Sequence, residues 1–540
     1  IEEYKAENVN VLSAALMAFA KAVKVFGGDA IFDDIMKHSS VIPDAIYQLY
    51  IGITLFIQLL APICTVSVVL SLLKNVSAYF SFILKYNKNV YIFSDLNEKS
   101  YTLAKNIRKT DKKCVMIFTD IYDEDGTKSE FIKHVKKLGS ICFRKDILTV
   151  DFNKHSSKKK VAFLLMNENE NVNTEQSLKL IEKYKNRENT DIYVMSRQPE
   201  TEILLSAADK GKLKVRRFNE ASALINRIFY SNEMALFGSA VDDGTDEKLI
   251  SAVVVGMGSI GKETVKTLSW FCQMDGYKIK INAFDGDPLC EDRFIAEAPE
   301  LMSEKYNGTF LPGEVRYEIK IHPGLYTDQN TFFEKIREIK NITYVMVSLG
   351  DDELNIKTAV NLRTEFERMG IHPFIHAVVY SSQNINALKE LKNYSGQAYD
   401  ISFIGDLESS FTEDIILGTE LEKDALERHL KWGKEEDFWN YEYNYRSSIA
   451  AAIHIKARIE CGNLVSEKAE SELTDEERLQ LENLEHRRWN AYMRSEGYVY
   501  SGSPDKKSRN NLGKMHHNLV PYEVLSEEDK RKDSKVGTKK

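Results

Sequence analysis

A glycine-rich segment, GMGSIG at residues 256–261, is the strongest chemical motif in the chain and directly follows the apolar run 250–255. Gly256 permits a tight turn, Gly258 lets the backbone approach a phosphate, and Gly261 lets the next helix pack closely on its strand. The free N–H groups at the start of that helix, near Ser259 and Ile260, attract an anion. The spacing therefore predicts a crevice for an adenine nucleotide or dinucleotide.

Two acids follow the next apolar run, in KIKINAFDGD at residues 278–287. A carboxylate at the end of this second strand can accept hydrogen bonds from a ribose diol, and Asp285 is better placed for this than Asp287. The alternative is a fold that keeps its glycines for packing and binds nothing.

No catalytic or metal-binding constellation emerges from the rest of the sequence. The eleven histidines show no metal-ligand spacing, and there is no nucleophile elbow, Walker lysine motif or HExxH. The net charge of −8, with both signs interspersed, argues against nucleic acid as a partner. We therefore expect a binding protein rather than an enzyme.

The elements that position the glycine motif alternate between short β-rich runs and charged helices, a pattern typical of a parallel, doubly wound α/β sheet. The pattern occurs twice, over residues 89–231 and 249–415. In the first unit the equivalent turn, SDLNEKS at 94–100, has no glycine and carries Asp95 and Glu98, whose charges would repel a phosphate. We interpret this unit as structural or as an assembly surface; the alternative is a divalent cation held by the two acids.

A membrane region is predicted before these units, over residues 1–88. Residues 45–73 form a long uncharged apolar run, and about 20 such residues suffice to span a bilayer as a helix. Residues 9–27 carry two lysines and fit a pore or interfacial helix. Lysines follow the long run, so we expect the inner (plasma) membrane, with residues after about 74 cytoplasmic. Pro62 predicts a kink in a pore-lining helix, whose outer partner we expect before Ile1.

The tandem units behind a membrane helix resemble the RCK domains that regulate potassium channels and transporters. The resemblance rests on GMGSIG, on Asp285 and on SLGDDELNIKTAVNLR at 348–363. It implies that Asp351 and Asn355 lie beside the nucleotide crevice, and that the chain assembles into a homo-oligomeric ring, most simply a tetramer. A TVGYG-type potassium filter is absent from the sequence, so potassium selectivity is not supported.

The C-terminal segment 481–533, after a helical connector at 416–480, closely resembles the ryanodine-receptor repeat (RyR) domain of bacterial proteins. The resemblance rests on EHRRW at 485–489, GYVY at 497–500, and HNLVPY at 517–522. It implies a small helical domain with a ligand pocket, to which the preceding helix 445–459 contributes. The pocket residues it implies are Arg446, Ser448, His486, Arg488, Trp489, Tyr498, Tyr500, His517 and Tyr522. The alternative is that these aromatic side chains simply pack in the core of a helical hairpin.

Together these patterns predict a ligand-gated ion channel or membrane effector whose RCK/RyR ring senses a nucleotide-derived signal, a combination that the resemblance associates with antiphage defence. The expected ligands are NAD, ATP or ADP, an ADP-ribose-like molecule or a cyclic nucleotide, and the expected partners are the lipid bilayer and further copies of the chain. Two alternatives stay open. One is the NAD- or ATP-binding regulatory ring of a cation transport system, and the other is a membrane-anchored NAD-dependent oxidoreductase.

Overall fold

The computed structural model describes residues 78–120, 129–310, 314–381 and 399–538, together with positions 13, 24, 49, 51–53, 56 and 60–64. The predicted membrane helices at 9–27 and 45–73 therefore lie largely outside the described residues. Within the described positions, no helix combines the length and apolar character needed to cross a bilayer. The chain divides into two compact units, residues 1–86 with 141–144, and residues 87–140 with 145–540. The second unit carries every candidate site.

The first parallel sheet of this second unit runs in the order β2-β1-β4-β5-β6. Its strands are β1 (Val90–Phe93), β2 (Val115–Phe118), β4 (Val161–Leu165), β5 (Thr190–Met195) and β6 (Lys214–Phe218). Helices α5 (Glu98–Thr110), α6 (Ser129–Lys137), α7 (Glu170–Tyr184), α8 (Pro199–Ala207) and α9 (Glu220–Ser231) connect them. Strands β1, β2 and β4 are apolar and buried on both faces, as parallel sheets covered by helices require, whereas the edge strand β6 carries one lysine and two arginines.

The second sheet has the order β10-β9-β8-β11-β12-β13, with β7 (Val241–Asp242) antiparallel to β8. The strands are β8 (Lys248–Val255), β9 (Tyr277–Asp285), β10 (Tyr317–Pro323), β11 (Tyr344–Val347), β12 (Phe374–Val378) and β13 (Ile401–Ile404). Its helices are α10 (Ser259–Phe271), α11 (Cys290–Glu297), α12 (Asn330–Glu338) and α13 (Asp352–Met369). Numbered from β8, this is the strand order 3-2-1-4-5-6 of dinucleotide-binding folds. The predicted pair of Rossmann-like sheets is confirmed.

The remainder of the chain is mainly helical, as expected. It contains α15 (Leu407–Ser410), α16 (Glu413–Ile416), α17 (Thr419–His429), α18 (Glu435–Asn440), α19 (Glu442–Glu460), α20 (Asp475–Ser495) and α21 (Glu527–Gly537). A short parallel pair, β14 (Val499–Tyr500) with β15 (Met515–His516), interrupts the helices. Helix α20 begins at a capping box formed by Thr474 and Glu477, which fixes the start of the segment that carries the EHRRW motif.

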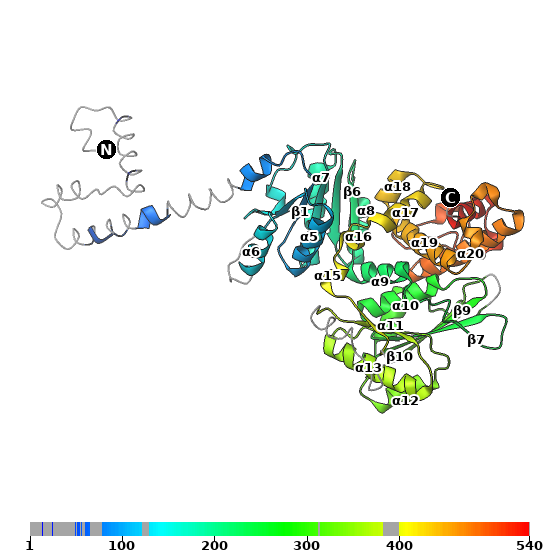
Figure 1. Ribbon diagram of the computed structural model, residues 1–540. Coiled ribbons are helices and arrows are strands. Elements are labelled where there is room, and N and C mark those ends of the chain that lie inside the picture. Colours follow the sequence, from blue (N-terminus) through cyan, green and yellow to red (C-terminus); the bar gives the residue numbers. More distant parts are fainter. Residues whose placement is uncertain are drawn as a thin grey trace. The chain divides into compact units, whose positions relative to one another are not determined.

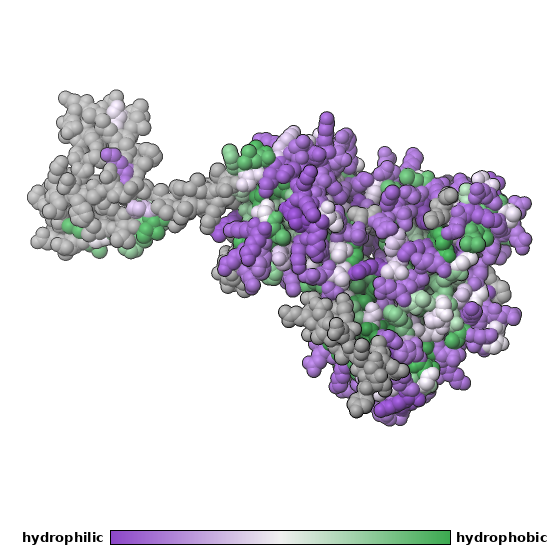
Figure 2. All heavy atoms as spheres, viewed as in Figure 1, coloured by the Kyte–Doolittle hydropathy of each residue, from purple (hydrophilic) through white to green (hydrophobic). Residues whose placement is uncertain are grey.

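One hydrophobic core joins these parts. Phe229 of α9, Phe271 of α10, Ile453 of α19 and Tyr492 of α20 belong to the same cluster of buried side chains. Figure 1 shows α9 and α10 beside α19 and α20, at the centre of this unit. The C-terminal helices are therefore part of the packing that covers the second sheet. Where described, the surface seen in Figure 2 is predominantly hydrophilic, as the high content of charged residues predicts.

A buried histidine in the second sheet should make the stability of this fold depend on pH. His376 on β12 is 1% exposed, and burial lowers its pKa from 6.5 to about 3. The unfolded chain takes up a proton below pH 6.5 while the folded chain does not, so folding free energy is lost as the pH falls. This histidine alone accounts for about 1.5 kcal/mol between pH 6.5 and 5.

We expect a His376→Gln variant to show a smaller decrease in thermal midpoint between pH 7.5 and 5 than the wild-type chain. Glutamine does not titrate, and its carbonyl oxygen can still accept a hydrogen bond from the Tyr344 hydroxyl, which lies 3.0 Å from His376 Nδ1. Midpoints are measured by differential scanning fluorimetry at both pH values. Equal decreases in the thermal midpoint of the two proteins would show that His376 does not cause the pH dependence.

Candidate functional sites

The glycine motif adopts the geometry that its spacing predicts. Gly256 has a φ of +96°, and a Cβ atom there would lie 2.4 Å from the Ser348 carbonyl oxygen. A Cβ at Gly261 would lie 1.7 Å from the Gly256 carbonyl oxygen, so the start of α10 packs directly on the turn. At Gly258 a Cβ would meet no atom within 4 Å. Gly256 and Gly261 are thus required by packing, whereas Gly258 faces open space.

This open space is a crevice of about 400 Å³, within the roughly 300–1,000 Å³ typical of ligand sites. Gly256, Gly258, Ser259, Ile260 and Asp285 all line it, as the sequence predicts. Helix α10 begins after Gly258 with no side-chain cap, so the first N–H groups of the helix are available to an anion.

Asp285 lies at the end of β9 and is partly engaged by the chain itself. Its Oδ2 accepts a hydrogen bond from the Met257 backbone N–H at 2.5 Å, and its Oδ1 accepts one from the Asp287 N–H at 2.7 Å. A carboxylate has about four lone-pair positions, so two protein bonds leave room for a ribose hydroxyl. Asp285 therefore both braces the glycine turn and borders the crevice.

The opposite wall of the crevice comes from the first sheet, a feature that the sequence motif does not show. Arg197 follows β5, and Glu220 begins α9. Arg197 pairs with Glu170 at 2.8 Å, and its side chain is 65% exposed. The carboxyl ends of strands from both sheets thus border one cavity, and a bound ligand would contact both Rossmann-like folds.

Gly261, which packs against the turn, does not line the crevice, and neither do three other residues predicted for it. Asp287 forms an ion pair with Arg293 outside the cavity. Asp351 caps α13 by accepting a hydrogen bond from the Leu354 N–H at 2.8 Å. Asn355 is fully buried, where it accepts from the Leu349 N–H at 2.7 Å and donates to the Val378 carbonyl at 2.8 Å. Asp351 and Asn355 thus fix the loop after β11, so they support the crevice without facing a ligand.

The equivalent turn of the first sheet has no phosphate cradle. Asn97 caps α5 through the Ser100 N–H and also donates to the Met166 carbonyl at 2.8 Å. Asp95 accepts a hydrogen bond from the Leu96 N–H. The side chains that replace glycine thus close the turn on itself. Over the described part of the chain, no group of three or more potential metal ligands occurs here or elsewhere.

A second cavity, which we call the C-terminal pocket, has a volume of about 290 Å³ and lies between α17, α19, α20 and α21. It brings together Ser448, His486, Arg488, Trp489 and His517, which the sequence places up to 69 positions apart. Five of the predicted ligand-contacting residues therefore share one cavity.

Aromatic and imidazole rings form one wall of the C-terminal pocket. The ring centres of Trp489 and His516 are 4.8 Å apart in a T-shaped arrangement, and His516 stacks on His517 at 4.7 Å. His486 lies beside Trp489, and its Nε2 is hydrogen-bonded to the Val520 carbonyl oxygen at 2.8 Å. Among the residues that the structure describes, neither ring nitrogen of His517 has a hydrogen-bond partner, and burial lowers its pKa, so the ring is neutral at pH 7. His517 can therefore donate one hydrogen bond to a ligand and accept another.

Two buried arginines, Arg428 and Arg488, line this pocket, and a third, Arg458, shares the carboxylate Glu485 with Arg488; we call the three the arginine cluster. Arg488 Nη2 lies 2.6 Å from Glu485 Oε1, and Arg458 Nη2 lies 3.8 Å from Oε2. Each arginine is at most 7% exposed, and within the described residues each has at least one side-chain nitrogen without a hydrogen-bond partner. Burial lowers the pKa of Arg458 to about 10, despite the nearby carboxylate. The arginine cluster is short of negative charge.

The wider lining shows the same imbalance. Five cationic side chains border the pocket: Arg428, Arg488, Lys506, Arg509 and Lys532. Three carboxylates border it: Glu485, Asp529 and Asp533. Lys506 and Lys532 already pair with Glu528, which lies outside the lining, so the attraction for an anion comes from the arginines.

Four other residues predicted for this pocket lie elsewhere. Tyr498 is in the hydrophobic core at 5% exposure, and Tyr522 is buried with its hydroxyl donating to Glu482 at 2.5 Å. Tyr500 packs against the core, and its N–H donates to Glu300. Arg446 forms a two-pronged ion pair with Glu496 and borders a different cavity. For the three tyrosines, the packing alternative describes their environment better.

The sequence motifs did not point to Arg428 or Arg458. These residues lie on α17 and α19, outside the segment that resembles the RyR domain, and nothing in their local spacing distinguishes them from surface arginines. Arg509, Lys506 and Lys532 lie within or beside that segment, in charged stretches that look like a solvated face.

The similarities of this chain to known proteins are distant. No family model and no curated protein matches the chain. Among solved structures, a dipicolinate synthase subunit from Bacillus halodurans is similar over 62% of this chain and 97% of its own length, with 13% identity and a TM-score of 0.21. Likeness of this degree does not bear on what either cavity binds.

Proposed function

We propose that the second compact unit, residues 87–140 with 145–540, is the nucleotide sensor of a ligand-gated ion channel or membrane effector. The observation that carries the proposal is that Arg428 and Arg488 of the arginine cluster line the same pocket as the rings of Trp489, His516 and His517. Phosphate oxygens would supply the missing negative charge, and charge-assisted hydrogen bonds to guanidinium groups are the strongest that a protein makes to them. The rings above offer faces and edges to a base.

The crevice at Gly258 is the second proposed nucleotide site. Its support is the open approach at Gly258, the uncapped start of α10 and the carboxylate of Asp285. The resemblances to RCK and RyR domains agree with two ligand sites behind a pore. Residues 45–73 are the proposed pore helix, and a ring of four chains is the proposed assembly.

Gating in this scheme requires that the ligand bind the open and closed rings with different affinity. The full chain, reconstituted in liposomes that contain an ion-sensitive dye, is mixed with ADP-ribose, ATP or NAD, and with adenosine as the control without phosphate. We expect at least one phosphate-bearing probe to bind in isothermal titration calorimetry and to increase ion flux, and adenosine to do neither.

Three results separate this proposal from its alternatives. Binding of a probe without flux would refute the channel and leave the regulatory ring of a transport system. Equal binding of adenosine and ADP-ribose would refute the role of the arginine cluster. Consumption of NADH with a carbonyl substrate would refute a pure sensor and favour the membrane-anchored oxidoreductase.

A further inference from the structure

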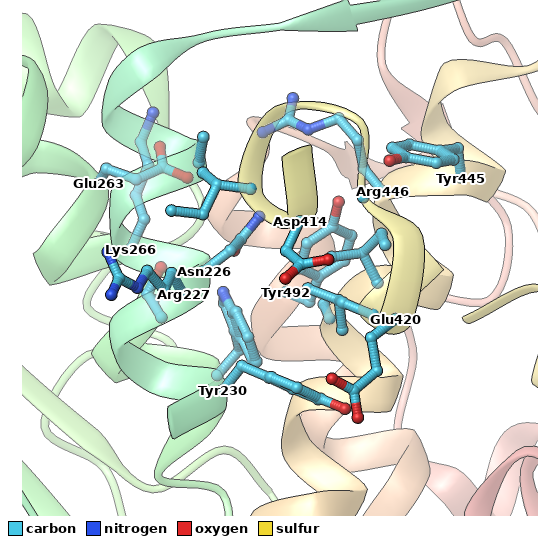
Figure 3. A pocket seen from close by; sticks show the side chains of 18 of the residues that line it. Asn226, Arg227, Tyr230, Glu263, Lys266, Asp414, Glu420, Tyr445, Arg446 and Tyr492 are labelled. Carbon is cyan, nitrogen blue, oxygen red and sulfur yellow. The ribbon is translucent and has the colours of Figure 1, made fainter. Parts of the chain in front are cut away.

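A third cavity, which we call the junction cavity, lies where α9, α10, α17, α19 and α20 meet and has a volume of about 360 Å³. Its lining comes from the first Rossmann-like fold, the second one and the C-terminal helices together. Figure 3 shows side chains from all of these helices converging on it. It is distinct from the crevice and the C-terminal pocket, with which it shares at most Ala223.

The inner part of the junction cavity combines apolar walls with two hydroxyl groups. Trp270, Ile449 and Ala450 form apolar wall and are nearly or fully buried. Tyr492 and Thr267 are 5% and 1% exposed, and within the described residues neither hydroxyl forms a hydrogen bond, although both residues line the cavity. Neither hydroxyl is sealed from the cavity, so each is open to a hydrogen bond with a ligand.

The cations around this cavity are already engaged by the protein. Arg446 donates to both oxygens of Glu496, at 2.6 and 3.0 Å. Lys266 donates to Glu297 at 3.2 Å, outside the cavity. Arg227 extends to the Ser409 carbonyl at 2.6 Å. Arg227 keeps its charge, because its partner is a neutral carbonyl, but the lining holds four carboxylates (Glu263, Asp414, Glu420 and Glu496) against these three cations.

Carboxylates are the other charged groups that line the junction cavity. Glu420 lines the cavity and forms no ion pair or hydrogen bond among the described residues. Figure 3 shows Glu420 beside Tyr230, and the Asp414 carboxylate near the middle of the cavity. Acids and aromatic rings together favour a cation, which is attracted both by the charge and by the ring faces.

We propose that the junction cavity binds a small organic amine, with its apolar or aromatic body against Trp270 and Ile449 and its ammonium group directed toward Glu420. The hydroxyls of Tyr492 and Thr267 would hydrogen-bond to a heteroatom of the body. The junction cavity would bind a cation, whereas the two nucleotide sites would bind anions. The chain would therefore have ligands of two chemical classes.

Tryptamine is a suitable probe, with indole-3-acetate as its anionic counterpart of nearly the same shape. Binding to the full-length protein in lipid nanodiscs is measured by ligand-observed NMR titration. We expect saturable binding of tryptamine and none of indole-3-acetate. Glu420→Gln should weaken tryptamine binding by about tenfold, since a charge-assisted hydrogen bond is lost. Tyr492→Phe, which keeps the ring in the core, should weaken it by a smaller factor.

The matched control is Glu427→Gln, which neutralises an exposed acid on the same helix outside the cavity and should leave tryptamine affinity unchanged. The inference is overturned if the wild-type chain binds neither probe, if it binds indole-3-acetate as tightly as tryptamine, or if Glu420→Gln and Glu427→Gln behave alike. Each of these results is independent of whether nucleotides bind.

Discussion

A Gly258→Leu variant should lose nucleotide binding at the crevice and keep the stability of the wild-type chain. A Cβ at this position meets no atom within 4 Å, and the backbone φ of −69° suits any residue. The leucine side chain would therefore extend into the space where a phosphate approaches the start of α10. We expect no measurable binding, because both the volume and the N–H groups of the site are blocked.

Gly261→Ala is the matched comparison within the same motif. Its methyl group would lie 1.7 Å from the Gly256 carbonyl oxygen, so the turn and α10 must separate. This variant should lower the thermal midpoint strongly, whereas Gly258→Leu should not. Nucleotide titrations are carried out in an Arg488→Met background, so that only the crevice contributes. Retention of crevice binding in Gly258→Leu would show that the glycines serve packing alone.

An Arg488→Met variant is expected to lower the affinity of the C-terminal pocket for ADP-ribose or ATP by roughly 10- to 100-fold, the effect of one charge-assisted hydrogen bond of about 1.5–3 kcal/mol. Arg488 is 1% exposed, and its Nη1 has no hydrogen-bond partner in the described part of the chain. Methionine retains the apolar length of the side chain. Glu485 keeps Arg458 nearby, so its carboxylate is not left alone.

The control for this prediction is the neighbouring residue. Arg487 is also buried, but it pairs with Asp275 at 2.7 Å and does not line the pocket. Arg487→Met should leave ligand affinity unchanged, even if it lowers stability. Affinities are measured by calorimetry in a Gly258→Leu background. Similar affinities for both arginine variants would mean that the arginine cluster is structural.

The Rossmann-like folds were predictable because their signals are local. The strand Lys248–Val255, the glycine turn and the helix Ser259–Phe271 follow one another directly in the sequence. Each element therefore constrains the position of the next one in space. The same holds for His486 and Trp489, which are three positions apart on one helix and therefore share a face and a pocket. Whether they bind a nucleotide stays a prediction.

Other residues could not be placed from sequence because a helix separates neighbours by about 100° per residue. Arg446 and Ser448 are two positions apart on α19, so they point to different cavities. Tyr498 has the same amphipathic ring as a stacking residue, but only the three-dimensional packing shows that it is in the core. The arginine cluster combines α17, α19 and α20, and no sequence spacing records that combination.

The hydrophobic core shared by α9, α10, α19 and α20 also determines where this chain can be cut. Trp270 of the second Rossmann-like fold contacts the ring of Tyr492 on α20, with the ring centres 6.0 Å apart. His454 Nε2 of α19 lies 2.9 Å from the Gln273 carbonyl oxygen, just beyond α10. Removal of the C-terminal helices would therefore expose apolar side chains of α10 to water. A truncated chain that ends after the second sheet is thus expected to aggregate.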